Sequence, residues 1–114
     1  MHCKRGDVIL VRFPNSDLRT FKKRPALVIQ ADGLDTGIDQ KLAAIITSNL
    51  SRKGPTRIHI PKDSDVGRQM GVLTDSVIMA DNIIIILDRE MDKVVGRCNE
   101  MQKVDTALRI TLAI

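Results

Sequence analysis

The sequence predicts a mainly β fold of the α+β class: about seven short strands curl into a small barrel, and one C-terminal helix follows them. Two observations carry this prediction. Short apolar runs separated by turn-forming residues occupy residues 8–98, and residues 99–112 then change to a helical spacing of apolar side chains. Because strands and helices do not alternate along the chain, we expect an antiparallel sheet rather than a parallel one.

Each predicted strand is a short apolar run, rich in β-branched residues, without helical periodicity. Clusters of Pro, Gly, Asn, Asp and Ser, such as 14–17 and 61–65, separate the runs and favour turns. His59 falls on an outward position of its strand, so we expect it to lie on a solvated face. The predicted strands are 8–13, 26–30, 42–47, 56–60, 76–79, 83–87 and 94–98.

A helix is predicted at the end of the chain. Its apolar stripe recurs at steps of three and four residues, through Met101, Val104, Leu108 and Leu112. Asn99 is a plausible N-cap, with Gln102 three residues later in capping-box register. This helix is expected to pack its stripe against the sheet.

Length and composition indicate one ordinary globular domain spanning residues 1–114. The chain has 43% hydrophobic and 28% charged residues, a balance that argues against disorder. No apolar run reaches the roughly 18 residues of a membrane span, and no apolar signal core follows the N-terminus, so a cytoplasmic protein is expected. Cys3 and Cys98 are expected to be reduced thiols. With only two histidines and no ligand cluster, we expect no metal site and no cofactor.

The net charge of +4 is unevenly distributed along the chain. Residues 1–30 contain seven Lys and Arg against two Asp, and residues 51–70 contain five against two. The segments 31–50 and 71–114 each have a net charge of −2. Two basic blocks of this kind favour a polyanion as partner, although solvated basic loops are also common.

Three segments carry a specific resemblance: Arg5–Val11 opens a strand with Gly-Asp, Arg24–Gln30 opens one with Arg-Pro, and Ala43–Ser48 ends one with a hydroxyl residue. At these spacings the chain resembles the MazF/PemK family of toxin endoribonucleases. The resemblance spans most of the chain and implies the SH3-like barrel of the MazF and CcdB toxins. It places Arg24 and Thr47 on the catalytic pair of the family.

The implied reaction is metal-independent, sequence-selective cleavage of single-stranded RNA. The ribose 2′-hydroxyl would attack the phosphate and leave a 2′,3′-cyclic phosphate and a 5′-hydroxyl. Arg24 suits this chemistry because its guanidinium can grip two phosphate oxygens, and the Thr47 hydroxyl can hydrogen bond to the same group. Alternatively, Arg24 is a plain surface residue and Thr47 caps local backbone. The resemblance further implies a homodimer and a cognate antitoxin protein whose acidic segment covers the basic groove.

Other residues are candidates for RNA binding. Lys22, Lys23 and Ser48 flank the pair, and the lysines would meet phosphates unless they form a solvated charge run. Asp81 and Asn82 match an acidic and an amide position of the family and could read a base, or Asp81 could accept a proton; an Asp-Asn turn between strands is the alternative. Phe21 could stack on a base, but packing on the barrel is the preferred interpretation.

One departure from the family keeps a second function open. Where the family has Arg-Thr, this chain has Ile84-Ile85. A positive group near the site, or its support, is therefore missing. The alternative is a non-catalytic binding protein on the same barrel: a CcdB-like gyrase poison, or a member that binds antitoxin or RNA without cutting.

Overall fold

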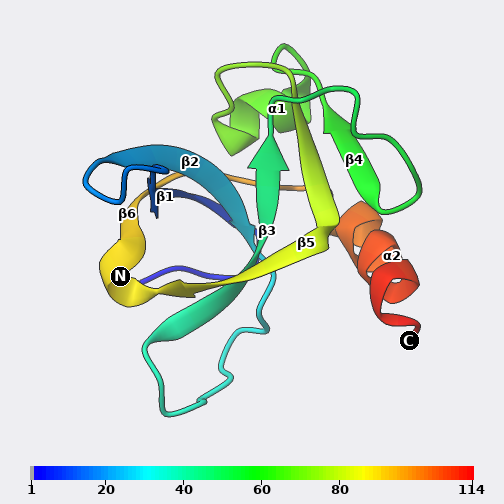
Figure 1. The fold of residues 1–114 in the computed structure, drawn as a ribbon. Helices are drawn as coiled ribbons and strands as arrows, with labels where there is room; N and C mark the ends of the chain where they lie inside the picture. Colours follow the sequence, from blue (N-terminus) through cyan, green and yellow to red (C-terminus); the bar gives the residue numbers. More distant parts are fainter. Residues whose placement is uncertain (1) are drawn as a thin grey trace.

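The computed structural model describes residues 2–114 as one curled antiparallel sheet of six strands, in the order β4-β5-β3-β2-β1-β6. Figure 1 shows the sheet wrapping around itself, with the C-terminal helix α2 beside β5 and β4. The mainly β, α+β fold class is therefore confirmed. The elements are β1 (Asp7–Pro14), β2 (Phe21–Val28), β3 (Gln40–Thr47), β4 (Arg57–Ile60), α1 (Asp65–Met70), β5 (Ser76–Leu87), a 3₁₀ turn (Asp88–Glu90), β6 (Met91–Arg97) and α2 (Met101–Leu112).

The described chain has six strands because two of the predicted ones are continuous. Residues 76–79 and 83–87 both belong to β5, which is 12 residues long. Met79 pairs with Ile45 and Ile83 pairs with Ala44, so the three residues between them form a bulge on β5. The predicted alternative of an Asp-Asn turn is wrong, because Asp81 and Asn82 occupy this bulge within a strand.

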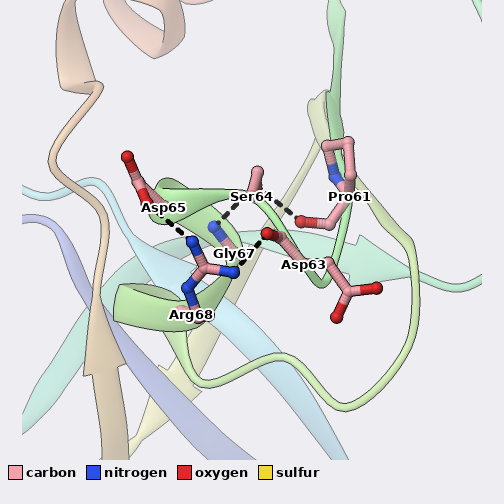
Figure 2. Close-up of polar contacts among 6 residues, drawn as sticks. All are labelled: Pro61, Asp63, Ser64, Asp65, Gly67 and Arg68. Carbon is pink, nitrogen blue, oxygen red and sulfur yellow. Dashed lines mark hydrogen bonds and ion pairs between the residues drawn. The ribbon is translucent and has the colours of Figure 1, made fainter.

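The short helix α1 was not predicted, because its residues fall beside a segment that looks like a turn. Ser64 is its N-cap: the Ser64 hydroxyl accepts a hydrogen bond from the Gly67 amide (3.0 Å) and donates one to the Pro61 carbonyl (2.6 Å). Figure 2 shows these bonds together with Arg68, which pairs with Asp65 and also donates to the Asp63 carbonyl. The turn residues 61–65 are thus a capping loop.

Helix α2 lies where the sequence predicts it, with two differences in detail. Its N-cap is Glu100 rather than Asn99, and no side chain caps that end, so the predicted capping box is absent. Val104, Ala107 and Leu108 are buried against the sheet, whereas Leu112 is 52% exposed. The apolar stripe therefore ends one turn before the helix does.

Two apolar clusters fill the interior. One lies beneath α1 and α2 and includes Val8, Ile78 and Val104, and the other lies within the curl of β1, β2 and β3 and includes Ile9 and Val28. Cys3 and Cys98 are buried in different clusters and are free thiols, as expected. His59 is exposed on β4, also as expected. Neither α-helix of the described residues has the length and apolar character needed to cross a bilayer.

Candidate functional site

A small hollow of about 170 Å³ lies where the β1–β2 hairpin leaves the rest of the sheet. Strand β2 pairs with β3 only over Ala26–Val28, while its first half stays paired with β1. The hairpin therefore extends past the end of β3 and leaves a gap between the two. The hollow is lined by Lys22, Lys23, Arg24, Pro25, Ile46, Thr47, Ser48, Thr74 and Ser76.

The register of the sheet explains why Arg24 and Thr47 share this hollow. Ala26 pairs with Ile45 in the antiparallel β2–β3 ladder. Extended by two residues, the same register places Arg24 opposite Thr47. Opposite residues in neighbouring strands have side chains on the same face of a sheet. The structure thus brings together two residues that are far apart in sequence.

Two cations at the hollow are unpaired. Lys22 and Arg24 are exposed, and neither side chain forms a hydrogen bond or an ion pair with any residue of 2–114. Lys23 differs, because its ammonium group lies 3.1 Å from a carboxylate oxygen of Asp92 on β6, which also holds Arg12 at 3.0 Å. The hydrogen bond from Lys23 lowers the pKa of Asp92, so this carboxylate stays ionised at neutral pH. Lys22 and Arg24 are therefore the charges available to an anion.

Hydroxyl groups form the opposite side of the hollow. The Thr47 hydroxyl oxygen accepts a hydrogen bond from the Asn49 amide (3.1 Å), so it caps local backbone while its own proton stays free to donate. Ser48 and Thr74 are exposed, and Ser76 is buried. The Ser76 hydroxyl donates its proton to the Thr74 carbonyl, so it does not donate into the hollow. Two cations and the hydroxyls of Thr47 and Ser48 in one hollow make a binding site for a tetrahedral anion such as phosphate.

Several of the remaining basic residues form ion pairs within the fold. Arg5 pairs with Asp105, Arg12 with Asp92, Arg57 with Asp81 and Arg68 with Asp65. Part of the charge of the two basic blocks is therefore neutralised within the fold. Among the residues that line the hollow, Lys22 and Arg24 are the cations without an ion pair to any described residue.

The structure does not bring Asp81 and Asn82 to this hollow. Both lie on the β5 bulge, whereas the β5 residue that pairs with Thr47 is Val77. Asp81 forms a two-pronged ion pair with Arg57, at 2.7 and 3.2 Å, and these bonds lower the pKa of its carboxyl group. A carboxylate held in this way is a poor proton acceptor. The role of Asp81 and Asn82 in RNA binding stays a prediction.

Phe21 does not pack on the barrel as predicted. Its side chain is 63% exposed at the start of β2, opposite Pro14. The sequence also did not reveal Thr74 and Ser76 as lining residues. They precede and begin β5, and the pairing of Val77 with Thr47 brings this end of β5 to the hollow.

Larger hollows lie at the other end of the sheet, but their chemistry suits a polyanion less well. The one of about 520 Å³ is lined by Asp35, Asp39 and Asp88 against a single basic residue, Lys41, apart from His2. Carboxylates repel phosphate groups. Chemistry rather than size therefore favours the hollow at Arg24 and Thr47.

Comparison with known families identifies the chain. Residues 4–112 match the model of the PemK-like, MazF-like toxins of type II toxin-antitoxin systems. The chain belongs to this toxin family. The match covers nearly all of the sequence, which confirms the resemblance seen in the three segments around Arg5, Arg24 and Thr47.

Solved structures of MazF-like toxins share the whole fold. An endoribonuclease from a Mycobacterial species, in complex with its cognate antitoxin, is 22% identical with a TM-score of 0.73, over 99% of this chain and 97% of its own. A second Mycobacterial endoribonuclease is 25% identical (TM-score 0.71; 98% and 92% covered). MazF from Deinococcus radiodurans is 18% identical (TM-score 0.73; 100% and 99% covered). No curated protein sequence matches the chain.

Proposed function

We propose that this family member is an endoribonuclease that cuts single-stranded RNA at the hollow between β2 and β3. The observation that carries the proposal is the pair of unpaired cations, Lys22 and Arg24, in one hollow with the hydroxyls of Thr47 and Ser48. The endoribonucleases of similar fold support the same activity. The hollow is smaller than the roughly 300 Å³ of a typical ligand pocket, which suits a site that grips one group of a longer chain.

In the proposed reaction the RNA supplies its own nucleophile. The 2′-oxygen loses its proton and attacks phosphorus, the bond to the 5′-oxygen breaks, and that oxygen takes up a proton. The products are a 2′,3′-cyclic phosphate and a 5′-hydroxyl. Arg24 donates two hydrogen bonds to the phosphorane oxygens, where negative charge develops, and Thr47 donates a third.

Arg24 acts in this scheme by stabilising charge rather than by accepting the proton. A guanidinium has only N–H donors and no acceptor atom, so Arg24 is suited to hydrogen bonding the phosphate and not to accepting a proton. The residues that line the hollow include no carboxylate and no imidazole. The proton acceptor therefore comes from solvent, from the substrate or from a group outside this lining.

The family also points to partners. We infer that the protein acts as a homodimer in the cytoplasm and that an antitoxin protein binds and neutralises it. The similar Mycobacterial endoribonuclease forms a complex with its cognate antitoxin. The unpaired cations of the hairpin offer an acidic antitoxin segment the same charges that they offer RNA. Antitoxin and RNA would then compete for Lys22 and Arg24.

Cleavage should persist in EDTA and should be confined to RNA. The 2′-hydroxyl is the nucleophile and Arg24 supplies the positive charge, so the reaction needs no added ion, whereas DNA lacks the nucleophile. The test is incubation with a mixed RNA pool and a matched DNA pool in EDTA, followed by mapping of the 5′ ends. Activity that stops with chelator and returns with Mg²⁺ or Zn²⁺ would contradict the mechanism.

Lys22→Ala should weaken RNA binding by a similar factor for every sequence tested. Lys22 is exposed and unpaired, so its ammonium group is free to contact a phosphate, and such contacts hold the strand without reading bases. The salt dependence should fall as well, by about 0.7 in the slope of log K against log[salt] for one lost contact. Titrations at several salt concentrations measure both effects. Lys103→Ala, on α2, is the control and should change neither.

A further inference from the structure

A second hollow, of about 370 Å³, opens directly beside the candidate site. The two hollows share Lys23, Pro25, Thr74 and Ser76 in their linings. The first is lined mainly by cations and hydroxyls. The second is mainly apolar, and its other lining residues are Val8, Leu10, Gly71, Val72, Leu73, Lys93 and Val95.

The wall of the second hollow is formed where α1 ends against β6. Gly71 caps α1 with a left-handed backbone (φ +73°), and a Cβ there would come within 2.4 Å of the Val95 carbonyl oxygen. This turn carries residues 72–74 along the hollow toward β5. Leu73 is 91% exposed, so it contributes a free apolar surface to the rim rather than core packing.

Ser76 is the buried polar residue among those that the two hollows share. Its residue is only 4% exposed, and its hydroxyl donates to the Thr74 carbonyl at 2.8 Å. The donated proton leaves the lone pairs of the Ser76 oxygen free to accept a hydrogen bond. An apolar pocket with one buried acceptor can select a flat ligand that carries an N–H edge.

The charges around the second hollow are mainly positive. Lys23 and Lys93 line it, and Arg12 lies opposite Lys23 in the β1–β2 ladder. Asp92 is the counter-charge and holds both Arg12 and Lys23. These four groups carry a net positive charge, so the surroundings of the apolar surface attract a phosphate chain.

We propose that the second hollow seats one nucleobase of the bound RNA, next to the phosphate held at Arg24 and Thr47. The base lies against the apolar side chains of Leu10, Pro25 and Leu73 and donates an edge N–H to Ser76. This proposal rests on the proposed RNA-binding function. It adds a base-reading subsite made by β1, β6 and the segment after α1.

The test is an abasic scan of a bound strand. A short 2′-O-methyl RNA cannot be cut, and each of its bases is removed in turn while binding is followed by fluorescence anisotropy. In the wild type, one abasic position should weaken binding about 10-fold, the scale of losing one stacked base. Leu73→Ala should reduce that penalty to about 3-fold or less. Ser76→Ala should bind the abasic strand as tightly as the wild type does. It should no longer distinguish strands that carry different bases at that position.

Leu34→Ala is the matched control, because Leu34 is an exposed leucine in a hollow at the other end of the sheet. It should keep the full penalty. An abasic penalty that is equal in the wild type and Leu73→Ala would overturn the subsite. If Leu73→Ala also changed the mass measured by light scattering, the hollow would instead be a contact between copies of the protein.

Cleavage of unmodified RNA, measured in parallel, separates the subsite from the proposed function. If the wild type cuts RNA but Leu73→Ala has the same abasic penalty as the wild type, only the subsite is contradicted. If Leu73→Ala lowers the abasic penalty but the wild type does not cut RNA, the subsite is supported and the proposed nuclease activity is contradicted. A wild type that neither binds nor cuts RNA overturns both.

Discussion

Arg24→Ala should lower cleavage of single-stranded RNA by about 10²-fold or more, the usual cost of removing one preorganised donor from a developing oxyanion. The fold should not change, because the side chain is exposed and forms no hydrogen bond or ion pair within residues 2–114. Single-turnover cleavage at saturating RNA measures the effect on the chemical step, and circular dichroism checks the fold. Arg19→Ala is the matched control: Arg19 is exposed on the same hairpin but does not line the hollow.

Arg24→Lys separates charge from geometry. Lysine keeps the positive charge but loses the planar fork that binds two phosphate oxygens at once, so we expect little rescue. Substantial rescue would show that charge alone suffices. If Arg24→Ala cuts a saturating RNA as fast as the wild type, the catalytic assignment is wrong, and the non-cutting binding protein becomes the better interpretation.

The fold class was predictable because the apolar runs and the final helical stripe are strong local signals. The merging of two predicted strands into β5 was not predictable, because the Asp-Asn sequence within the bulge at Ala80–Asn82 is also typical of a turn. Helix α1 was missed for a similar reason. Only six residues long, it depends on the Ser64 cap and on packing of Met70 in the core rather than on its own periodicity.

The candidate site was predictable only where family motifs mark it. Arg24 and Thr47 carry that signal, and the β2–β3 register places them opposite each other, as described above. Thr74 and Ser76 carry no motif, and their place at the hollow follows from how the start of β5 packs. The pairing of Asp92 with Lys23 likewise joins β6 to β2, and no local pattern reveals it.

The exposure of Phe21 could not be inferred from composition. The chain has only two aromatic residues, fewer than proteins that stack RNA bases usually have, and this favoured packing over base stacking for Phe21. Phe13 does pack on the inner cluster, whereas Phe21 lies at the open end of the hairpin, beyond the sheet that could cover it. Hairpin length, a property of the whole sheet, decides which phenylalanine is buried.

Gly96→Ala should destabilise the protein by about 3 kcal/mol, because no room exists for a methyl group. A Cβ at Gly96 would lie 2.3 Å from the Met70 carbonyl carbon and 2.4 Å from the Gln69 and Met70 carbonyl oxygens. These are backbone atoms at the end of α1, so the helix itself must move away from β6. For a domain of this size the melting temperature should fall by roughly 10 °C, measured by thermal unfolding.

Gly33→Ala is the control for the backbone cost of replacing a glycine where the new methyl group meets no neighbour. Its φ of +73° disfavours alanine, but nothing lies within 4 Å of the added Cβ, so the expected loss is only about 1 kcal/mol. The difference between the two variants isolates the close contact of α1 with β6. Because that contact sets the wall of the second hollow, Gly96→Ala should also weaken base discrimination at conditions where it remains folded. Equal melting temperatures for the two variants would show that α1 moves away from β6 at little cost.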